Sequence, residues 1–211
     1  LSDGKVNFEI QLTQLVKLFK NGEPFKMSKR AGTFITLRDL VEQVGPDVTR
    51  FHMLTRRQDA PLDFDFDKVL EQTKENPVFY VQYANARIHS VMRKAQAAGL
   101  DISEAALQTA DLSQNAHAAE LALVRKIAEW PRLLELAAKH NEPHRISFYL
   151  YELAAEYHYL HNLGKAEPHL RFYQEDNEKR SLAKIAQIRA VSVVLSTGLA
   201  ILGVTAMEEM H

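Results

Sequence analysis

The chain has 211 residues, of which 46% are hydrophobic and 25% are charged, and its formal net charge is −1. This composition is ordinary for a globular protein of one or two domains. Because the sequence has no cysteine, disulfides and thiolate metal sites are excluded, and we expect a cytoplasmic location.

Positive charge is concentrated in two stretches of the sequence. Between positions 17 and 57, nine Lys and Arg stand against four acidic residues, and between positions 76 and 100 three stand against none. Local basic surfaces on a nearly neutral chain suggest that a polyanion is bound at chosen places. The commoner explanation, an ordinary solvated surface, stays open at this point.

The chain begins at Leu1, without an initiator Met, a signal sequence or a transit peptide, and we expect it to be a piece of a longer protein. Asn21-Gly22 then predicts a β-hairpin, because a type I′ turn requires positive φ at both central residues. The basic segment KMSKR, residues 26–30, would follow this hairpin as a loop.

Short elements are predicted after the loop. A helix is expected over 36–45, with Thr36 as its N-cap and Gly45 at its end, and Pro46 predicts the start of a second helix. Residues 60–70 are expected to be an extended connector whose Phe64 and Phe66 insert into neighbouring elements. A further helix is expected to start at residue 67.

The rest of the chain predicts helices only. They are expected over 77–98, over 117–140 with a bend at Trp130-Pro131, over 143–163 and over 181–202, with a polar connection at 99–115. The last helix is apolar nearly all round, which places it at the centre of a bundle. Its apolar run, 190–204, is shorter than a membrane-spanning helix, so we expect a buried helix and no membrane segment.

Two patterns could indicate metal sites. Asp63, Asp65 and Asp67 alternate as in a calcium loop, but lysines stand at the sixth and twelfth loop positions, where glycine and glutamate are required. His158 and His161 are three residues apart on one helix and could ligate a metal, but no matching carboxylate or third histidine is evident, so we prefer to interpret them as partly buried helix histidines. No metal site is therefore predicted.

The helix 77–98 carries a candidate binding site. At about 100° per residue, Tyr83, Arg87 and Lys94 lie along one edge of this helix. Aromatic rings beside cations suit the unstacked bases and phosphates of RNA. The alternative is that the tyrosines pack in the bundle with their hydroxyls at its rim. We prefer packing for Tyr80 and RNA contact for Tyr83 and Arg87.

The segment FKMSKRAGTFITLRDLVEQVGPDVTRFHML resembles the second signature of class I aminoacyl-tRNA synthetases, the KMSKS loop, followed by a Gly-x-Asp-x-x-Arg-aromatic helix start. The segments APLDFDFDKVLEQTKENPVFYVQYANARIHSV, YLYELAAEYH and GLAILGVTAMEEM are similar to the arginyl-tRNA synthetases of the bacterial type. The resemblance covers essentially the whole chain except 95–117.

This resemblance implies a fold and a domain division. The fold would be mainly α, with an N-terminal β-hairpin-and-helix tail of a class I catalytic domain over 1–75 and a DALR-type α-helical anticodon-binding bundle over 76–211. The implied activity is that of an aminoacyl-tRNA ligase, which uses ATP, with Mg²⁺ accompanying the nucleotide, to form arginyl-adenylate and then charges arginine tRNA. The implied state is a monomer.

The resemblance also implies roles for the loop residues. Lys26 and Lys29 would close over the ATP phosphates and stabilise the negative charge that builds on the leaving pyrophosphate. Met27 and Ser28 would shape the loop and contact the nucleotide with them. Arg30 stands where the signature has Ser, which leaves its role open, and a proline replaces the small residue common after the family's Gly.

Neither a HIGH-like segment nor a run of parallel strands alternating with helices is recognisable in the sequence. We therefore expect the adenine and arginine pockets to be missing, and the chain alone to be inactive while still binding tRNA weakly. Two alternatives stay open: a synthetase of the cysteinyl type, which has a similar loop and a related helical domain, and a non-catalytic helical RNA-binding or protein-interaction module.

Overall fold

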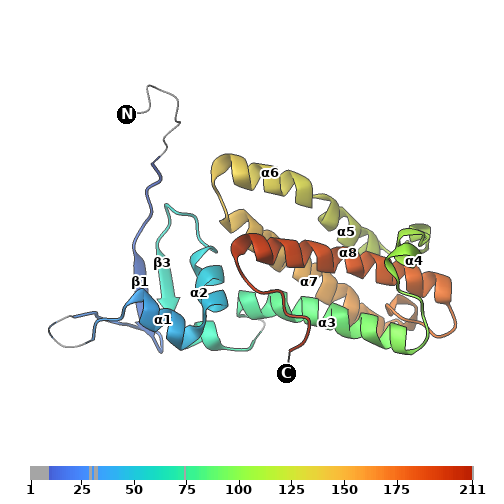
Figure 1. The fold of residues 1–211 in the computed structure, drawn as a ribbon, viewed down its shortest axis with the longest axis horizontal. Helices are drawn as coiled ribbons and strands as arrows, with labels where there is room; N and C mark the ends of the chain where they lie inside the picture. Colours follow the sequence, from blue (N-terminus) through green and yellow to red (C-terminus); the bar gives the residue numbers. More distant parts are fainter. Residues whose placement is uncertain (1–9, 29, 31–32, 74, 211) are drawn as a thin grey trace.

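The computed structural model describes residues 10–28, 30, 33–73 and 75–210. Figure 1 shows a small sheet with two short helices at one end of the molecule and a bundle of long helices at the other. The mainly α fold with a hairpin-and-helix part before the bundle is confirmed.

The sheet has the strand order β2-β1-β3. Strands β1 (Val16–Lys20) and β2 (Glu23–Pro24) form the predicted antiparallel hairpin, and its turn residues Asn21 and Gly22 have φ of 50° and 79°, as a type I′ turn requires. Strand β3 (Leu62–Asp65) pairs with β1 in parallel.

The prediction for residues 60–70 was therefore partly wrong. The segment expected to be a connector contains a strand, and the helix expected at residue 67 is only the 3-10 turn Lys68–Leu70. Aspartate is depleted in strands, so the alternation of Asp and Phe did not indicate a strand at these positions. The insertion of Phe64 and Phe66 is confirmed, since both are buried in a small core with Leu40, Val44 and Val69.

Helices α1 (Leu37–Val44) and α2 (Pro46–Met53) lie between β2 and β3 in the chain. Thr36 is the predicted N-cap of α1, and its side chain and that of Asp39 form a reciprocal capping box. Phe51 of α2 is fully buried in the core of the bundle, so α2 joins the two parts of the molecule.

The bundle is built from α3 (Pro77–Ala97), α5 (Ala118–Ala128), α6 (Trp130–His140), α7 (His144–Ala166) and α8 (Glu178–Leu202). The predicted bend at Trp130-Pro131 is a break between α5 and α6, because Pro131 suits the first turn of a new helix. The connection 99–115 contains a short helix α4 (Glu104–Gln108), which was not predicted.

Helix α8 lies in the core of the bundle and contacts α3, α5 and α7. With 25 residues, it is longer than the apolar run within it, and it meets the length and hydropathy criteria for a membrane span. However, 56% of its most apolar window is buried in the protein. The helix also carries Lys184, which is fully buried against Glu120 of α5. We therefore interpret α8 as a core helix.

The chain after α8 returns along α2 and α3. Asp47 accepts a hydrogen bond from the backbone N–H of Thr205 at 3.0 Å, and Arg50 donates to the carbonyl of Leu202 at 3.0 Å. The amide of Asn85 on α3 donates to the carbonyl of Met207 at 2.9 Å. Two polar residues of the Gly-x-Asp-x-x-Arg-aromatic pattern thus fix the C-terminal tail, residues 203–210.

Candidate functional site

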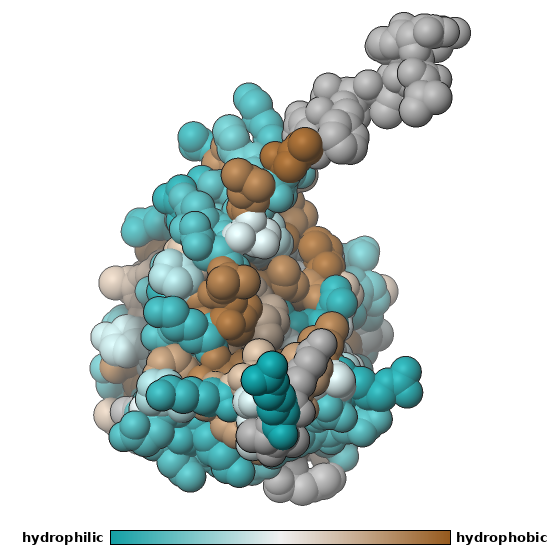
Figure 2. Space-filling view, turned by 90° about the vertical axis from the view of Figure 1, so that its left-hand side faces the viewer, coloured by the Kyte–Doolittle hydropathy of each residue, from teal (hydrophilic) through white to brown (hydrophobic). Residues whose placement is uncertain are grey.

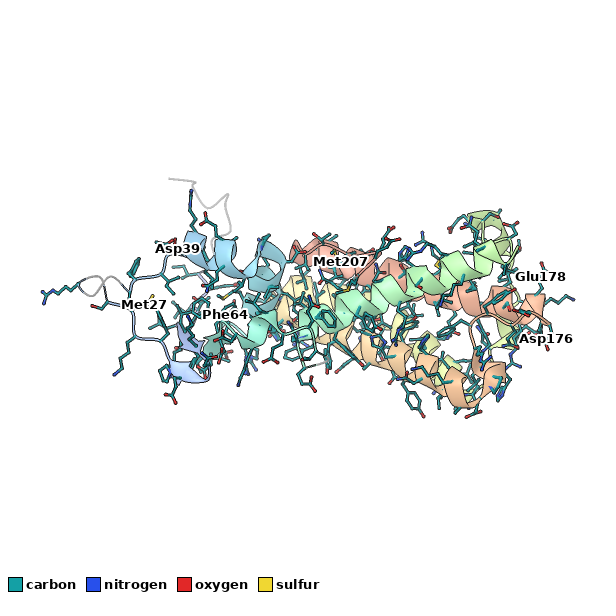
Figure 3. All side chains as sticks on the ribbon, turned by 90° about the horizontal axis from the view of Figure 1, so that it is seen from below. Met27, Asp39, Phe64, Asp176, Glu178 and Met207 are labelled. Carbon is teal, nitrogen blue, oxygen red and sulfur yellow. The ribbon has the colours of Figure 1, made fainter. Side chains whose placement is uncertain are left out.

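The signature loop lies at the sheet end of the molecule. Met27 on this loop and Glu178 at the start of α8 lie at opposite ends of Figure 3. The side chain of Lys26 is exposed, Met27 is 48% exposed, and Ser28 is half-buried. Lys29, the second lysine of the signature, lies outside the described residues.

Thr33 closes the neck of this loop, a role that the sequence analysis did not find. Its hydroxyl accepts a hydrogen bond from the backbone N–H of Ser28 at 3.1 Å and donates to the carbonyl of Lys26 at 3.2 Å. Its own N–H donates to the carbonyl of Ser28 at 3.1 Å. The backbone on both sides of the loop is thus held together while the side chain of Lys26 stays exposed.

Two carboxylates hold the hairpin turn, that of Asp65 at the end of β3 and that of Asp67 just after it. Asp65 accepts a hydrogen bond from the backbone N–H of Gly22 at 2.8 Å, and Asp67 accepts one from that of Asn21 at 2.8 Å. Burial raises the pKa of Asp65, but hydrogen bonds from three backbone N–H groups outweigh burial and hold this pKa below its ordinary value. Asp65 and Asp67 therefore have a structural role at the turn.

The predicted partners Tyr83 and Arg87 do meet on α3. Arg87 Nη2 donates to the Tyr83 hydroxyl at 2.6 Å, and the guanidinium carbon lies 4.5 Å from the Tyr83 ring centroid. Arg87 Nη1 also lies 3.5 Å from Nδ1 of His158 on α7. Both Tyr83 and Arg87 are half-buried, so each keeps part of its surface in contact with solvent.

His158 forms the base of this cluster, and it is buried on its helix, as expected, but its contact with Arg87 was not predicted. Its ring stacks on that of Tyr83, with centroids 5.7 Å apart and 27° between the planes, and it also packs against Tyr80 at 4.6 Å. Burial, together with the charge of Arg87, lowers the pKa of His158 to about 4. The imidazole is therefore neutral at pH 7, and Arg87 supplies the positive charge of the cluster.

Tyr80 and Lys94 of α3 have different surroundings from Tyr83 and Arg87. Tyr80 packs between His158 and Tyr151 of α7, which agrees with the packing interpretation. Lys94 is exposed and lies two helical turns beyond Arg87, roughly 10 Å further along the helix axis. The structure thus brings Tyr83 and Arg87 together and places Lys94 at a separate pocket near the end of α3.

The comparisons with known proteins agree with this architecture. The family model described as "DALR anticodon binding domain" matches residues 81–210. An arginine–tRNA ligase of Ruegeria pomeroyi is 67% identical over 211 residues, which are 100% of this chain and 36% of that protein. For a Cereibacter sphaeroides protein of the same name the identity is 68%, with the same coverage. The chain thus spans about a third of the length of these curated relatives.

Solved structures give the same result for the fold. A crystal structure from Campylobacter jejuni, assigned as an arginyl-tRNA synthetase, has a TM-score of 0.80 and 32% identity and covers 96% of this chain and 41% of its own. The arginyl-tRNA synthetase of Thermus thermophilus has a TM-score of 0.68 and 24% identity, over 92% of this chain and 34% of its own, which is a likeness of fold. Since the family model covers more than half of the sequence, the chain belongs to the family of DALR anticodon-binding domains.

Proposed function

We propose that this chain is part of an arginine–tRNA ligase and carries that enzyme's signature loop and tRNA-binding bundle. The observation that carries the proposal is the high identity to ligases of this name along the whole chain. Residues 1–75 would be the end of the catalytic domain, and residues 76–211 the anticodon-binding domain. The enzyme would join arginine to ATP as arginyl-adenylate, release pyrophosphate, and esterify its tRNA, as a cytoplasmic monomer.

In this proposal Lys26 and Lys29 act on the phosphates of ATP. Negative charge builds on the leaving pyrophosphate as the carboxylate of arginine attacks, and ammonium groups placed there lower the barrier electrostatically. The exposed side chain of Lys26, on a loop tied at its neck by Thr33, supports this role. Mg²⁺ would accompany the nucleotide, and within the described part of the chain no group of three or more potential metal ligands is found.

Tyr83, Arg87 and Lys94 would contact tRNA. The ring of Tyr83 packs against Phe79, His158 and Arg87, and the part of this side chain that stays exposed can contact an unstacked base. The guanidinium of Arg87 can pair with a phosphate while it stays bonded to the tyrosine hydroxyl. Because Tyr83 and Arg87 hold each other before RNA arrives, little side-chain entropy is lost on binding.

The apolar surface at the sheet end supports the assignment of residues 1–75 to a larger domain. Figure 2 views the molecule from that end and shows brown apolar side chains gathered among hydrophilic ones. Ile10, Leu12 and Leu15 are 75%, 82% and 84% exposed, and Leu37 of α1 is 69% exposed. Surfaces of this kind are normally covered by protein.

The tRNA part of the proposal is tested by titrating the chain with an unmodified arginine tRNA transcript and with an anticodon-swapped control. We expect weak binding that prefers the native anticodon and falls steeply with salt. Arg87→Gln should weaken it about 10-fold or more, whereas Arg125→Gln, at an exposed position of α5, should not. Equal affinity for both transcripts and no effect of Arg87→Gln would contradict this part.

The catalytic part is tested in the full-length protein by ATP–pyrophosphate exchange. Lys26→Ala and Lys29→Ala should each lower the rate on the order of 100-fold, whereas Lys20→Ala, an exposed lysine of β1, should leave it nearly unchanged. The 211-residue chain alone should show no exchange. A non-catalytic module would lose no activation with either loop variant, and charging of cysteine tRNA would point to the cysteinyl type.

A further inference from the structure

A pocket of about 400 Å³ lies at the end of the bundle where α3, α7 and the 3-10 turn Pro168–Leu170 meet. Its volume is in the range of small-ligand sites. Val91 and Lys94 of α3 form one side, His161 and Lys165 of α7 the other, and residues 170–173 close it. Of the three residues proposed above to contact tRNA, Lys94 lines this pocket, whereas Tyr83 and Arg87 do not.

The pocket is held in shape by close backbone packing. At Gly164 a β-carbon would lie 3.2 Å from both the α-carbon and the nitrogen of Arg171, so the returning chain packs directly on α7. Nε of Arg171 donates to the carbonyl of Gly164 at 3.2 Å, which fixes this guanidinium beside the pocket. Leu170 and Phe172 on either side are almost fully buried and anchor the segment.

The rim of the pocket is strongly basic. Lys94, Lys165 and Arg171 all line it, and none of the other lining residues is acidic. Within the described residues, the side-chain ammonium groups of Lys94 and Lys165 take part in no hydrogen bond or ion pair, so both are available to a ligand. A ligand with a phosphate group matches three converging cations without a carboxylate.

The floor of the pocket is flat and apolar. The ring of His161 stacks on that of Phe172, with centroids 5.9 Å apart and 28° between planes, and Phe172 in turn stacks on Tyr157 at 5.6 Å. Burial, with the charges of Arg87, Lys165 and Lys94, lowers the pKa of His161 to about 4, so the ring is a neutral surface at pH 7. Such a surface beside cations suits a nucleobase and its phosphate.

We propose that this pocket holds one unpaired nucleotide of the tRNA that binds along α3. The base lies against His161 and Val91, and its phosphate lies between Lys94, Lys165 and Arg171. The inference rests on the proposed function of the bundle in tRNA binding and adds a second contact, two helical turns beyond Arg87. It explains why cations gather around an apolar floor so far from the signature loop.

The test uses the anticodon stem-loop of arginine tRNA, with an abasic nucleotide at each loop position in turn. The native chain should bind the stem-loop about 10-fold more weakly when one particular loop position is abasic. Val91→Phe, which fills the pocket, should bind the intact stem-loop about 10-fold more weakly and be insensitive to the abasic change at that position. Lys165→Gln should lower the slope of log Kd against log salt by about 0.7, whereas Lys139→Gln on α6 should not.

The outcomes separate the two proposals. If the native chain binds tRNA and the stem-loop, but Val91→Phe and the abasic changes act additively, the pocket inference is wrong and the proposed function stands. An unchanged salt slope for Lys165→Gln likewise overturns the phosphate contact. If the native chain binds neither RNA, both proposals fail. Should Val91→Phe not fold, His161→Ala, which removes the ring that the base would lie against, takes its place in the same cycle with the abasic RNAs.

Discussion

The guanidinium of Arg50 lies against Gly203 so closely that a β-carbon at Gly203 would come within 2.5 Å of Arg50 Nε. The same Nε donates to the carbonyl of Leu202, in the last turn of α8. A cation at this end of a helix also meets the negative end of the helix dipole. The arginine of the signature pattern thus caps the central helix of the bundle and connects it to the sheet end.

Gly203→Ala should therefore lower the free energy of unfolding by more than backbone strain alone would. Gly203 has φ of 68°, which is unfavourable for alanine, and the new β-carbon would also displace Arg50 from the Leu202 carbonyl. We expect a loss of about 2 kcal/mol in the free energy of unfolding, measured by urea denaturation. Gly99→Ala is the control, since Gly99 has φ of 91° with open space around it, and it should cost about 1 kcal/mol. Equal costs would show that the Arg50 contact adds nothing.

The ion pair between Lys184 and Glu120 should respond asymmetrically to substitution. Both side chains are fully buried, Glu120 also accepts from the N–H of His117, and burial lowers the pKa of Lys184 although Glu120 opposes this. Glu120→Gln leaves a buried ammonium without its counter-ion and should cost about 3–5 kcal/mol. The double change Glu120→Gln with Lys184→Met should cost clearly less than the sum of the single changes, measured as a double-mutant cycle. Additive costs would contradict this coupling.

The sequence was most informative where structure is local. The hairpin turn follows from Asn21-Gly22, the start of α1 from Thr36 as its N-cap, and the meeting of Tyr83 with Arg87 from their spacing of one helical turn. These features depend on residues close to one another in the chain, so the pattern alone predicted them.

The features that were missed depend on residues far apart in the sequence. Strand β3 is stabilised by parallel pairing with β1, more than forty residues earlier, and no local pattern shows this. His158 meets Arg87 only because α7 packs on α3, and the pocket around Lys94 depends on the close packing of Arg171 on Gly164. The role of Thr33 also requires the loop to be folded back on itself.

The stability of the bundle should fall in mild acid. Burial, and then the charge of Arg87, lowers the pKa of both His158 and His161 from 6.5 to about 4. The unfolded chain therefore takes up protons at a higher pH than the folded chain does. This contribution is fully present above pH 6.5 and is lost as the pH falls from about 6.5 towards 4.

Urea unfolding at pH 7 and pH 5 tests this expectation. The free energy of unfolding should be lower at pH 5, and His158→Gln should make the difference smaller, since glutamine does not titrate. His52, His89 and His144 contribute in the same direction because burial lowers their pKa values as well, so part of the dependence should remain. A pH dependence that His158→Gln leaves unchanged would show that His158 is not responsible.

The hairpin that leads into the signature loop should depend on two aspartates, each holding its own N–H group. Asp65 accepts from Gly22 and Asp67 from Asn21, so Asp65→Ala should speed amide exchange at Gly22, and Asp67→Ala should speed it at Asn21. Because Asp65 is buried and accepts from several N–H groups, Asp65→Ala should also cost about 1–3 kcal/mol in stability, unlike Asp63→Ala at an exposed neighbouring position. Equal exchange changes at both amides in either variant would mean that the turn opens as a unit, so that the two carboxylates do not act separately.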